Sequence, residues 1–324
     1  MFQCPLCSGP PGSCRADFGE YQVIECARCG QLSTSPFPSP DTLRALYDTG
    51  YYSSPSAARF RVGAAERIVR FFRWRRATML KRRMRGVRGR RVLDVGCGRG
   101  DTLAWLQRWG ADVHGTQVSR TAAQVARDLI GHDRVFVGEL ADARYPDASF
   151  DCVTVWHVLE HVAEPLSLLE EIRRILRPNG FAYIEVPNAG GWAARRFGHH
   201  WLAYDVPKHL FHFSPATLEA LADRAGLDCV QETHSSLEYS PVTLLQTLLN
   251  VWLGGSSVLF RSLTTESDPK GPAAAGLVRR TLEPIIACAL VIPIAALSAG
   301  LSSRRNGETC GAFFQRRELP GGRG

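Results

Sequence analysis

The sequence lacks the basic start followed by an apolar run that marks a secretory signal peptide, since it begins MFQCPLCSGP. A cytoplasmic protein is therefore the expectation. In a reducing compartment, the ten cysteines of this 324-residue chain are expected to be metal ligands or buried thiols rather than disulfides. With 45% hydrophobic and 22% charged residues, the composition is that of a folded globular protein with one large core or two domains.

Acidic residues are absent from residues 70–91, a stretch that holds eleven arginines and lysines. Apolar side chains such as Phe71 and Trp74 interrupt the basic ones, which fits an amphipathic helix on anionic lipid headgroups. Nucleic acid is the competing partner. The net charge of +8 is a modest excess, and it points to phosphate, nucleic acid or a membrane surface without choosing among them.

Charged residues of either sign are absent from residues 239–260 and 284–303, and both stretches approach the length of a membrane span. A full crossing is disfavoured because the chain must return to complete its sheet. Two interpretations are left, a helical lid buried on the domain and a hairpin that dips into one leaflet. The second predicts peripheral contact with the inner face of the membrane.

The first thirty residues hold two C-x2-C pairs, separated by 18 residues, which is typical of a zinc ribbon. Each pair fits a tight knuckle, and four thiolates close a tetrahedral site with no open position. The sequence therefore predicts a structural zinc rather than a catalytic one. The alternative is four unrelated thiols. The predicted ligands are Cys4, Cys7, Cys26 and Cys29.

Beyond residue 90, short apolar segments alternate with helical patterns. Strands are expected at 91–95, 111–116, 134–137, 150–156, 181–186, 227–233 and 310–317. Helices are expected to begin at Asp101, Ser119, Pro165 and Ser214, and the motif RPNG at 177–180 is expected to be a turn. Strands separated by helices of this length predict an α/β fold with a doubly wound, mostly parallel sheet.

The first strand runs into the turn DVGCGRGD, whose three glycines let a ligand approach the backbone where strand meets helix. A nicotinamide-binding turn has the spacing G-x-G-x-x-G, whereas here it is G-x-G-x-G with an acid two residues before. This turn resembles the first motif of class I S-adenosylmethionine-dependent methyltransferases. The segments FDCVTVWHVLEHV (150–162) and EEIRRILRPNGFAYIEVPN (170–188) resemble further motifs of that family, over residues 91–235 in all.

The resemblance implies an S-adenosylmethionine site with a Rossmann-like methyltransferase fold. The glycine turn accepts the amino-acid part of the cofactor, and Glu139 stands where an acid commonly meets the adenine amine. The residues implied at the cofactor are Asp94, Gly96, Cys97, Gly98, Gly100, Gln117, Val118, Glu139, Leu140, Trp156, His157 and Tyr52.

Gln117 departs from the family pattern, which has Glu or Asp at the end of the second strand to bind the ribose hydroxyls. An amide side chain still hydrogen-bonds two hydroxyls, so we expect cofactor binding to be retained.

The flanking regions resemble one subgroup of the family, similar to sugar C-methyltransferases and glycan-locus enzymes, with a four-Cys knuckle and an LYDxxYY-like stretch. That resemblance implies a lid role for Tyr47, Tyr51 and Tyr52, where packing is the alternative reading. It also implies a small or glycan-related methyl acceptor. If the uncharged stretches contact a membrane, this acceptor is expected to be lipid-linked.

Methyl transfer to a hydroxyl or carbon acid needs a base as well as alignment. The segment HHWLAYDVPKHLFHFSP (199–215), here named the histidine segment, follows the fifth strand and is dense in titratable groups. The candidate catalytic residues are His209, His212 and Tyr204, with a polar loop or helix-capping role as the alternative. His157, Glu160 and His161 could suggest a metal, but a structural role is favoured there.

These observations predict a methyltransferase with five consecutive segments. They are a zinc-ribbon-like module at 1–40, a linker and basic helix at 41–90, the cofactor-binding core at 91–235, an apolar helical insertion at 236–303, and the last strand and tail at 304–324. The rival prediction is a zinc-ribbon protein that binds nucleic acid and has a non-catalytic methyltransferase fold.

Overall fold

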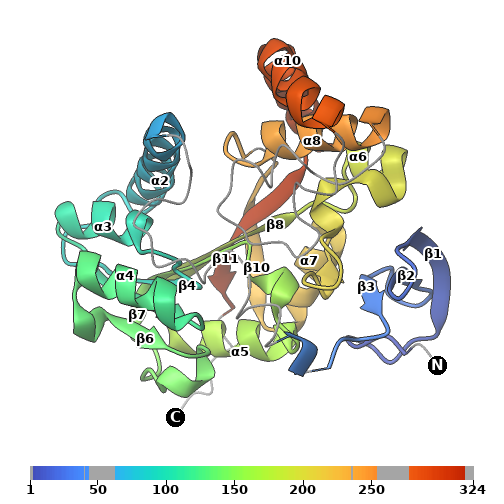
Figure 1. Ribbon diagram of the computed structural model, residues 1–324. Coiled ribbons are helices and arrows are strands. Elements are labelled where there is room, and N and C mark those ends of the chain that lie inside the picture. Colours follow the sequence, from blue (N-terminus) through green and yellow to red (C-terminus); the bar gives the residue numbers. More distant parts are fainter. Residues whose placement is uncertain (1–2, 40, 44–62, 235, 254–276, 318–324) are drawn as a thin grey trace. The chain divides into compact units, whose positions relative to one another are not determined.

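A computed structural model describes residues 3–39, 41–43, 63–234, 236–253 and 277–317 (Figure 1). The chain divides into two compact units, each built from three stretches. Unit 1 takes residues 1–67, 187–217 and 234–310, and unit 2 takes residues 68–186, 218–233 and 311–324.

Unit 2 is built on a seven-stranded sheet in the order β10-β11-β8-β7-β4-β5-β6. The pairs β4–β5, β4–β7, β5–β6 and β7–β8 are parallel, and β10 pairs antiparallel with β11. The strands are β4 (Arg91–Val95), β5 (Asp112–Gln117), β6 (Val135–Val137), β7 (Phe150–Trp156), β8 (Leu176–Pro187), β10 (Leu227–Thr233) and β11 (Thr309–Arg316). The predicted doubly wound α/β fold is confirmed.

The strand order reverses between β4 and β7. From β4 the chain adds β5 and then β6 on one side, and it returns to place β7 on the other side. In such sheets ligands bind at the carboxyl ends of the strands beside this switch point. The turn after β4 is therefore the expected place for a ligand.

Helices precede or connect the strands of this sheet. They are α2 (Gly63–Arg83), which lies before β4, α3 (Asp101–Arg108), α4 (Arg120–Ile130), α5 (Pro165–Ile175) and α7 (Pro215–Arg224), which lies before β10. Ser119 caps α4 by accepting a hydrogen bond from the Ala122 amide, as predicted. Asp101 is the first helical residue of α3 and not its cap, because Gly100 in a left-handed conformation takes the N-cap position.

The expected turn at 177–180 lies inside a strand instead. β8 begins at Leu176, which pairs with Phe150, and the next pair is Phe181 with Cys152. The residues between them form an irregularity in which Asn179 has a left-handed φ of 62°. The strand absorbs the turn residues as a bulge because its pairing with β7 resumes directly afterwards.

The basic stretch forms most of α2, and part of it packs into unit 2. Leu80 is fully buried in the core on the same side as Ala77. The Arg76 guanidinium lies 4.2 Å from the centre of the Trp156 ring, and Arg83 lies over Phe181 and Phe313 at 5.5 and 5.3 Å. These cations stack on aromatic rings, so a share of the basic run serves packing.

Unit 1 contains a four-stranded sheet in the order β1-β2-β3-β9, made of β1 (Pro11–Asp17), β2 (Gln22–Cys26), β3 (Leu32–Ser35) and β9 (Phe211–His212). Its helices include α6 (Trp192–Phe197), α8 (Ser240–Leu253) and α10 (Leu277–Ser303). Short helical turns η4 (Gly198–His200) and η5 (Leu202–Tyr204) follow α6. Apolar residues of the sheet, these turns and α8 share one core.

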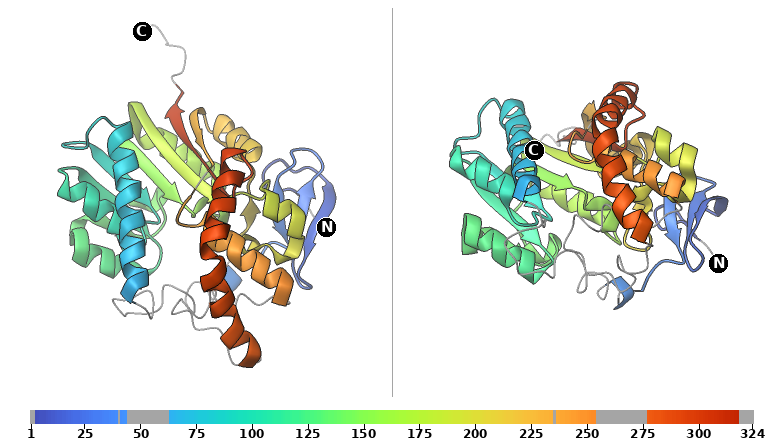
Figure 2. Two further views of the ribbon diagram at one scale, coloured as in Figure 1. Left: turned by 90° about the horizontal axis from the view of Figure 1, so that it is seen from above. Right: turned by 45° about the horizontal axis from the view of Figure 1, so that its top comes forward.

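The two uncharged stretches fall largely on α8 and α10, which lie side by side (Figure 2). Residues 243–250 of α8 are buried, so this helix packs in unit 1 as the lid interpretation requires. α10 keeps exposed apolar side chains, with Ile292 79% and Leu297 45% exposed. Among the described helices none has both the length and the apolar character needed to cross a membrane. Peripheral membrane contact stays a prediction.

A buried carboxyl group sits just before β11. Glu308 is 2% exposed, and its Oε2 accepts a hydrogen bond from Trp201 Nε1 at 2.7 Å. Its other oxygen has no hydrogen-bond partner within the described residues. Burial raises the Glu308 pKa to about 7, although the indole hydrogen bond opposes the rise.

This pKa predicts a pH-dependent stability. Because the folded state holds the proton more tightly than the unfolded chain, the contribution of Glu308 is full below about pH 4.5 and is lost as the pH rises through 7. The loss between pH 5 and 8 should be on the order of 2 kcal/mol. The free energy of unfolding of Glu308→Gln, measured with denaturant, should lack this pH dependence. At pH 8 the variant should therefore be more stable relative to the wild type than it is at pH 5. The exposed Glu219→Gln is the control, and parallel wild-type and Glu308→Gln curves would contradict the assignment.

Candidate functional site

The glycine turn between β4 and α3 has the left-handed backbone that glycine permits. The φ angles of Gly96, Gly98 and Gly100 are 66°, 56° and 79°. A Cβ atom at Gly96 would lie 2.4 Å from Val158 Cγ2, so a side chain does not fit there. The turn thus presents bare backbone at the switch point of the sheet, as the sequence predicts.

Asp94 precedes the turn and is 5% exposed on β4. Its Oδ1 accepts a hydrogen bond of 2.6 Å from Thr154 Oγ1 on the neighbouring β7. Burial raises the Asp94 pKa to about 6, and the Thr154 hydrogen bond and the charges of Arg76 and Arg73 oppose the rise. A buried carboxylate at this position can receive the cationic amino group of a ligand at neutral pH.

Cys97 lies within the turn, but its side chain belongs to the core. Its amide donates to the Thr116 carbonyl at 3.0 Å, and its sulfur lies 2.7 Å from where a Gly115 Cβ would stand. Burial raises the Cys97 pKa well above its usual range, so the thiol is neutral. What this residue offers a ligand at the turn is its backbone.

Gln117 ends β5 and is 4% exposed. Its Oε1 accepts a hydrogen bond from the Ser119 amide at 3.2 Å, which orients the amide group and turns its NH₂ away from that contact. The next residue, Val118, is 53% exposed. An amide donor followed by an exposed apolar side chain fits a ribose and a base edge. The Gln side chain offers the ribose an NH₂ donor, whereas a carboxylate at this position would offer two acceptor oxygens.

The end of β6 joins the same sheet edge. The Gly138 amide donates to the Gln117 carbonyl at 3.1 Å. Glu139 follows as an exposed acid, while Leu140 is buried and takes the N-cap position of η2 (Ala141–Ala143). Glu139 can therefore meet a ligand, and Leu140 contributes packing.

Trp156 and His157 stand at the end of β7. The Trp156 ring is packed between the Arg76 guanidinium and Tyr183, whose ring centre is 4.4 Å away. Trp156 is 9% exposed, and its Nε1 has no hydrogen-bond partner within the described part of the chain. Its direct contact with a cofactor stays a prediction, since most of the ring serves the core.

His157 adopts a left-handed φ of 52°, which is uncommon for a non-glycine residue. Its Nε2 lies 3.2 Å from Glu185 Oε1, and its Nδ1 lies 3.5 Å from Glu160 Oε1. Its amide also donates to the Glu185 carbonyl at 2.8 Å. Two carboxylates and the backbone therefore hold this imidazole at the carboxyl edge of the sheet.

Sequence reasoning missed Glu185 and Tyr183 on β8. Tyr183 Oη donates to Glu185 Oε2 at 2.9 Å, and Glu185 is 4% exposed. Burial would raise the Glu185 pKa, but the His157 hydrogen bond and charge and the Arg76 charge outweigh it, so the pKa is lowered. A charged residue in the apolar strand FAYIEV is the signal that could have found this cluster.

The histidine segment lies in unit 1, and its three candidate residues are all buried. Tyr204 is 2% exposed and packs edge-on against Trp201 at 5.0 Å and His212 at 5.2 Å between ring centres. Burial raises the Tyr204 pKa. These contacts favour a packing role for Tyr204, whose catalytic role stays a prediction.

Hydrogen bonds fix the tautomer of His212. Thr34 has one hydroxyl proton, and it donates to the His209 carbonyl at 2.6 Å. The contact of 3.2 Å between Thr34 Oγ1 and His212 Nε2 therefore requires the imidazole to be the donor. His212 donates its Nε2 proton in this bond and has its lone pair on Nδ1, and its catalytic role stays a prediction.

His209 has the other tautomer. Its Nδ1 lies 2.8 Å from the Ala203 carbonyl, which accepts only, so Nδ1 carries the proton. The basic lone pair of this imidazole is then on Nε2. Each neutral imidazole thus keeps one basic nitrogen, Nε2 in His209 and Nδ1 in His212.

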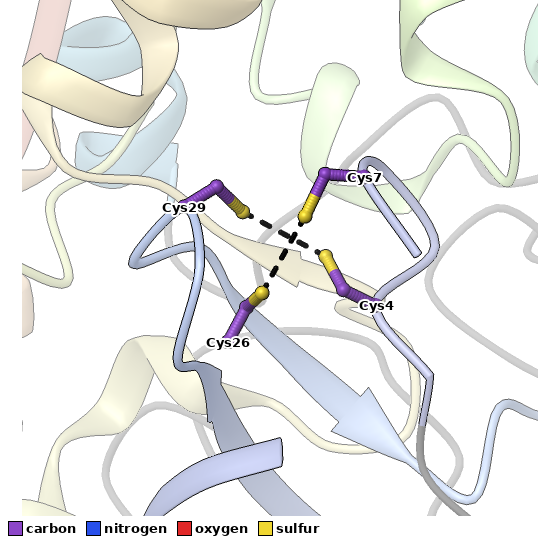
Figure 3. Close-up of side chains that lie close together, drawn as sticks. All are labelled: Cys4, Cys7, Cys26 and Cys29. Atoms are coloured by element: carbon purple, nitrogen blue, oxygen red, sulfur yellow. Dashed lines mark hydrogen bonds between the residues drawn. The ribbon is translucent and has the colours of Figure 1, made fainter. Parts of the chain in front are cut away.

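The four cysteines come together as predicted (Figure 3). Their sulfurs all lie within 4.8 Å of one another, with 3.7 Å between Cys4 and Cys29 and 3.5 Å between Cys7 and Cys26. A Cβ at Gly9 would lie 2.7 Å from the Cys26 sulfur, so the thiols crowd this glycine. The cluster is compatible with a zinc knuckle. Tyr47, Tyr51 and Tyr52 lie outside the described residues.

A seven-stranded sheet in this order, with a bare glycine turn after its first strand and an acid at that strand's end, defines a class I methyltransferase fold. The sequence profile of a family described as "Methyltransferase domain" matches residues 61–232. The chain belongs to this family, and it is an S-adenosylmethionine-dependent methyltransferase.

Known proteins with similar sequences are methyltransferases. The chain is 32% identical over 170 residues to a ubiquinone biosynthesis O-methyltransferase of Alkalilimnicola ehrlichii, covering 48% of this chain and 67% of the relative. It is 32% identical over 216 residues to methyltransferase GfsG of Streptomyces halstedii, covering 62% and 74%.

A solved structure shares the fold. In the complex between the Haloferax volcanii Trm112 methyltransferase activator and a methyltransferase, the matching chain has a TM-score of 0.50 at 19% identity. The match covers 80% of this chain and 95% of that one.

The glycine turn gives a testable prediction. Gly96→Ala combines a strained φ with a 2.4 Å clash at Val158 and should lower S-adenosylmethionine affinity at least tenfold in calorimetry. Gly89→Ala is the matched control, because its φ of 72° imposes the same strain with no atom within 4 Å. Wild-type affinity in Gly96→Ala would contradict this account of the turn.

Proposed function

We propose that this methyltransferase acts on a hydroxyl oxygen of a small acceptor that is glycan-related or lipid-linked. The observation that carries the proposal is the contact of 2.8 Å between His209 Nδ1 and the Ala203 carbonyl, which makes Nδ1 the protonated nitrogen of this neutral imidazole and Nε2 the basic one. Several relatives are ubiquinone biosynthesis O-methyltransferases, which supports an oxygen acceptor. The exposed apolar side of α10 supports a lipid-linked one.

The cofactor is assigned to the carboxyl edge of the unit 2 sheet. When bound, it supplies a methyl group already activated by a sulfonium. The glycine turn would hold the amino-acid portion, and Asp94 would offer a carboxylate to its amino group. Gln117 would donate to the ribose, and Glu139 would accept from the adenine amine. Asp94 suits its task, because its pKa of about 6 leaves it ionised at pH 7 and above.

His209 is assigned as the general base. His209 Nε2 would take the hydroxyl proton of the acceptor as the oxygen–methyl bond forms and the bond from the methyl to the sulfonium sulfur breaks, while Nδ1–H stays bonded to the Ala203 carbonyl. That carbonyl also stabilises the imidazolium that forms. His212 and Tyr204 support the segment through their contacts rather than exchanging protons.

The four-Cys cluster is assigned to zinc. Four sulfurs that each lie about 2.3 Å from a tetrahedral zinc ion are about 3.8 Å from one another. The sulfur–sulfur distances of 3.7 Å for Cys4 and Cys29 and 3.5 Å for Cys7 and Cys26 are close to this value. The Arg28 amide points at the Cys26 sulfur from 3.4 Å, the contact that stabilises a thiolate in a knuckle. With four protein ligands the ion would be structural.

The zinc assignment predicts one zinc per chain in metal analysis of the purified protein. Cys26→Ser removes a ligand and should lower the zinc content and the stability of unit 1. Cys14→Ser is the matched control, because Cys14 is exposed on β1 and outside the cluster. A wild type without zinc, with all four thiols freely titratable, would overturn the assignment.

The acceptor is tested with radiolabelled cofactor and separated soluble, lipid and polysaccharide extracts. Label should enter the lipid or polysaccharide fraction. His209→Asn keeps a donor for the Ala203 carbonyl but has no base, so transfer should fall about a hundredfold or more while cofactor affinity is retained. Unchanged transfer in His209→Asn would exclude this base. Salt-sensitive binding to DNA or RNA with no transfer to any fraction would favour the rival nucleic-acid-binding function.

A further inference from the structure

The strand that follows the four-Cys knuckle is also the strand that pairs with the histidine segment. β3 pairs antiparallel with β2 on one side and with β9 on the other. Leu32 is opposite His212 and Ser33 is opposite Phe211. The Thr34 amide extends the pairing by donating to the Leu210 carbonyl at 3.0 Å. The histidine segment is thus an added strand of the ribbon sheet.

Thr34 bonds to both histidines at once. It is 2% exposed, and its hydroxyl donates to the His209 carbonyl at 2.6 Å while accepting from His212 Nε2 at 3.2 Å. Buried hydrogen bonds of this kind are costly to lose, because both partners would be left unsatisfied. This hydroxyl fixes the backbone position of His209 directly.

Gln31 connects the same segment to the knuckle. Its carbonyl accepts from the Cys26 amide at 2.9 Å, which closes the turn that holds Cys26 and Cys29. Its side-chain Nε2 donates to the His212 carbonyl at 3.1 Å and to the Leu32 carbonyl at 2.7 Å. One buried residue therefore touches both the thiol cluster and the histidine segment.

Packing follows the same route as the hydrogen bonds. Apolar residues of the first three strands and of the histidine segment belong to one core in unit 1, among them Val23, Leu32, Trp201 and Tyr204. The Phe18 ring beside β1 meets Tyr204 edge-on at 5.9 Å. Loss of order in β1, β2 and β3 would consequently disturb the packing of the histidine segment.

We propose that the four-Cys module (residues 4–35) positions His209, with Thr34 and Gln31 as the positioning residues. The proposal rests on the function assigned to His209 above. It assigns to the bound metal the task of keeping β3 rigid, so that metal loss impairs methyl transfer while the cofactor-binding residues of unit 2 retain their affinity.

Three variants on β3 separate this role from general stability. Thr34→Val keeps the shape and removes the hydroxyl, and Thr34→Ser restores the hydroxyl. Ser33→Ala is the matched control, because the Ser33 hydroxyl is buried on the same strand but has no hydrogen-bond partner within the described residues. All three are made in the full chain.

Thr34→Val should raise amide hydrogen exchange at residues 209–213 about tenfold and lower kcat at least tenfold. Thr34→Ser should return both close to wild type, and Ser33→Ala should leave both unchanged. In all three, calorimetry should give the wild-type affinity for S-adenosylmethionine, and the zinc content should be unaltered.

Chelation of the metal from the wild type is the second arm. Exchange at 209–213 should rise together with that at 26–35, and cofactor affinity should hold. Unchanged exchange at 209–213 after metal loss would overturn the proposal, and so would loss of cofactor binding in Thr34→Val, which would mean general unfolding. Absence of methyl transfer by the wild type would instead reject the proposed function, whereas the exchange result would still report on the ribbon.

Discussion

The hydrogen bond from Thr154 to Asp94 joins β7 to β4, the two parallel strands between which the strand order of the sheet reverses. Because β4 and β7 are parallel neighbours at the switch point, their carboxyl ends open at one edge, and the bare glycine turn lies there. A buried acid would be costly without that partner. The bond keeps Asp94 oriented and opposes the rise in its pKa, so the acid at the cofactor edge remains a carboxylate near pH 7.

A second constraint acts on the histidine segment in unit 1. The chain leaves β8 at Pro187 and enters unit 1, where the histidine segment would have little regular structure of its own. Pairing with β3 supplies what it lacks, since Thr34 and Gln31 satisfy its backbone and one imidazole. The strands of the four-Cys module can order the segment in this way because Val23 and Leu32 anchor them in the core of unit 1.

The buried group of His157, Glu185 and Tyr183 shows where sequence reasoning stopped short. The motif resemblance led to His157, because it follows the fourth strand. Glu185 stands 28 residues later, and only the parallel register of β7 with β8 brings its carboxylate to the imidazole at 3.2 Å. Conversely, the RPNG motif predicts a turn from local preference, and strand pairing overrode it because β8 resumes its register at Phe181.

The sequence by itself determined the parts that depend on local pattern. The glycine spacing predicts the cofactor turn, the alternation of strands and helices predicts the parallel sheet, and the two C-x2-C pairs predict the thiol cluster. The tertiary structure decided which nitrogen of each histidine carries the proton, because that depends on the Ala203 carbonyl beside His209 and on the Thr34 hydroxyl beside His212. It also decided that α8 is a packed helix, since an uncharged sequence fits a protein core as well as a membrane.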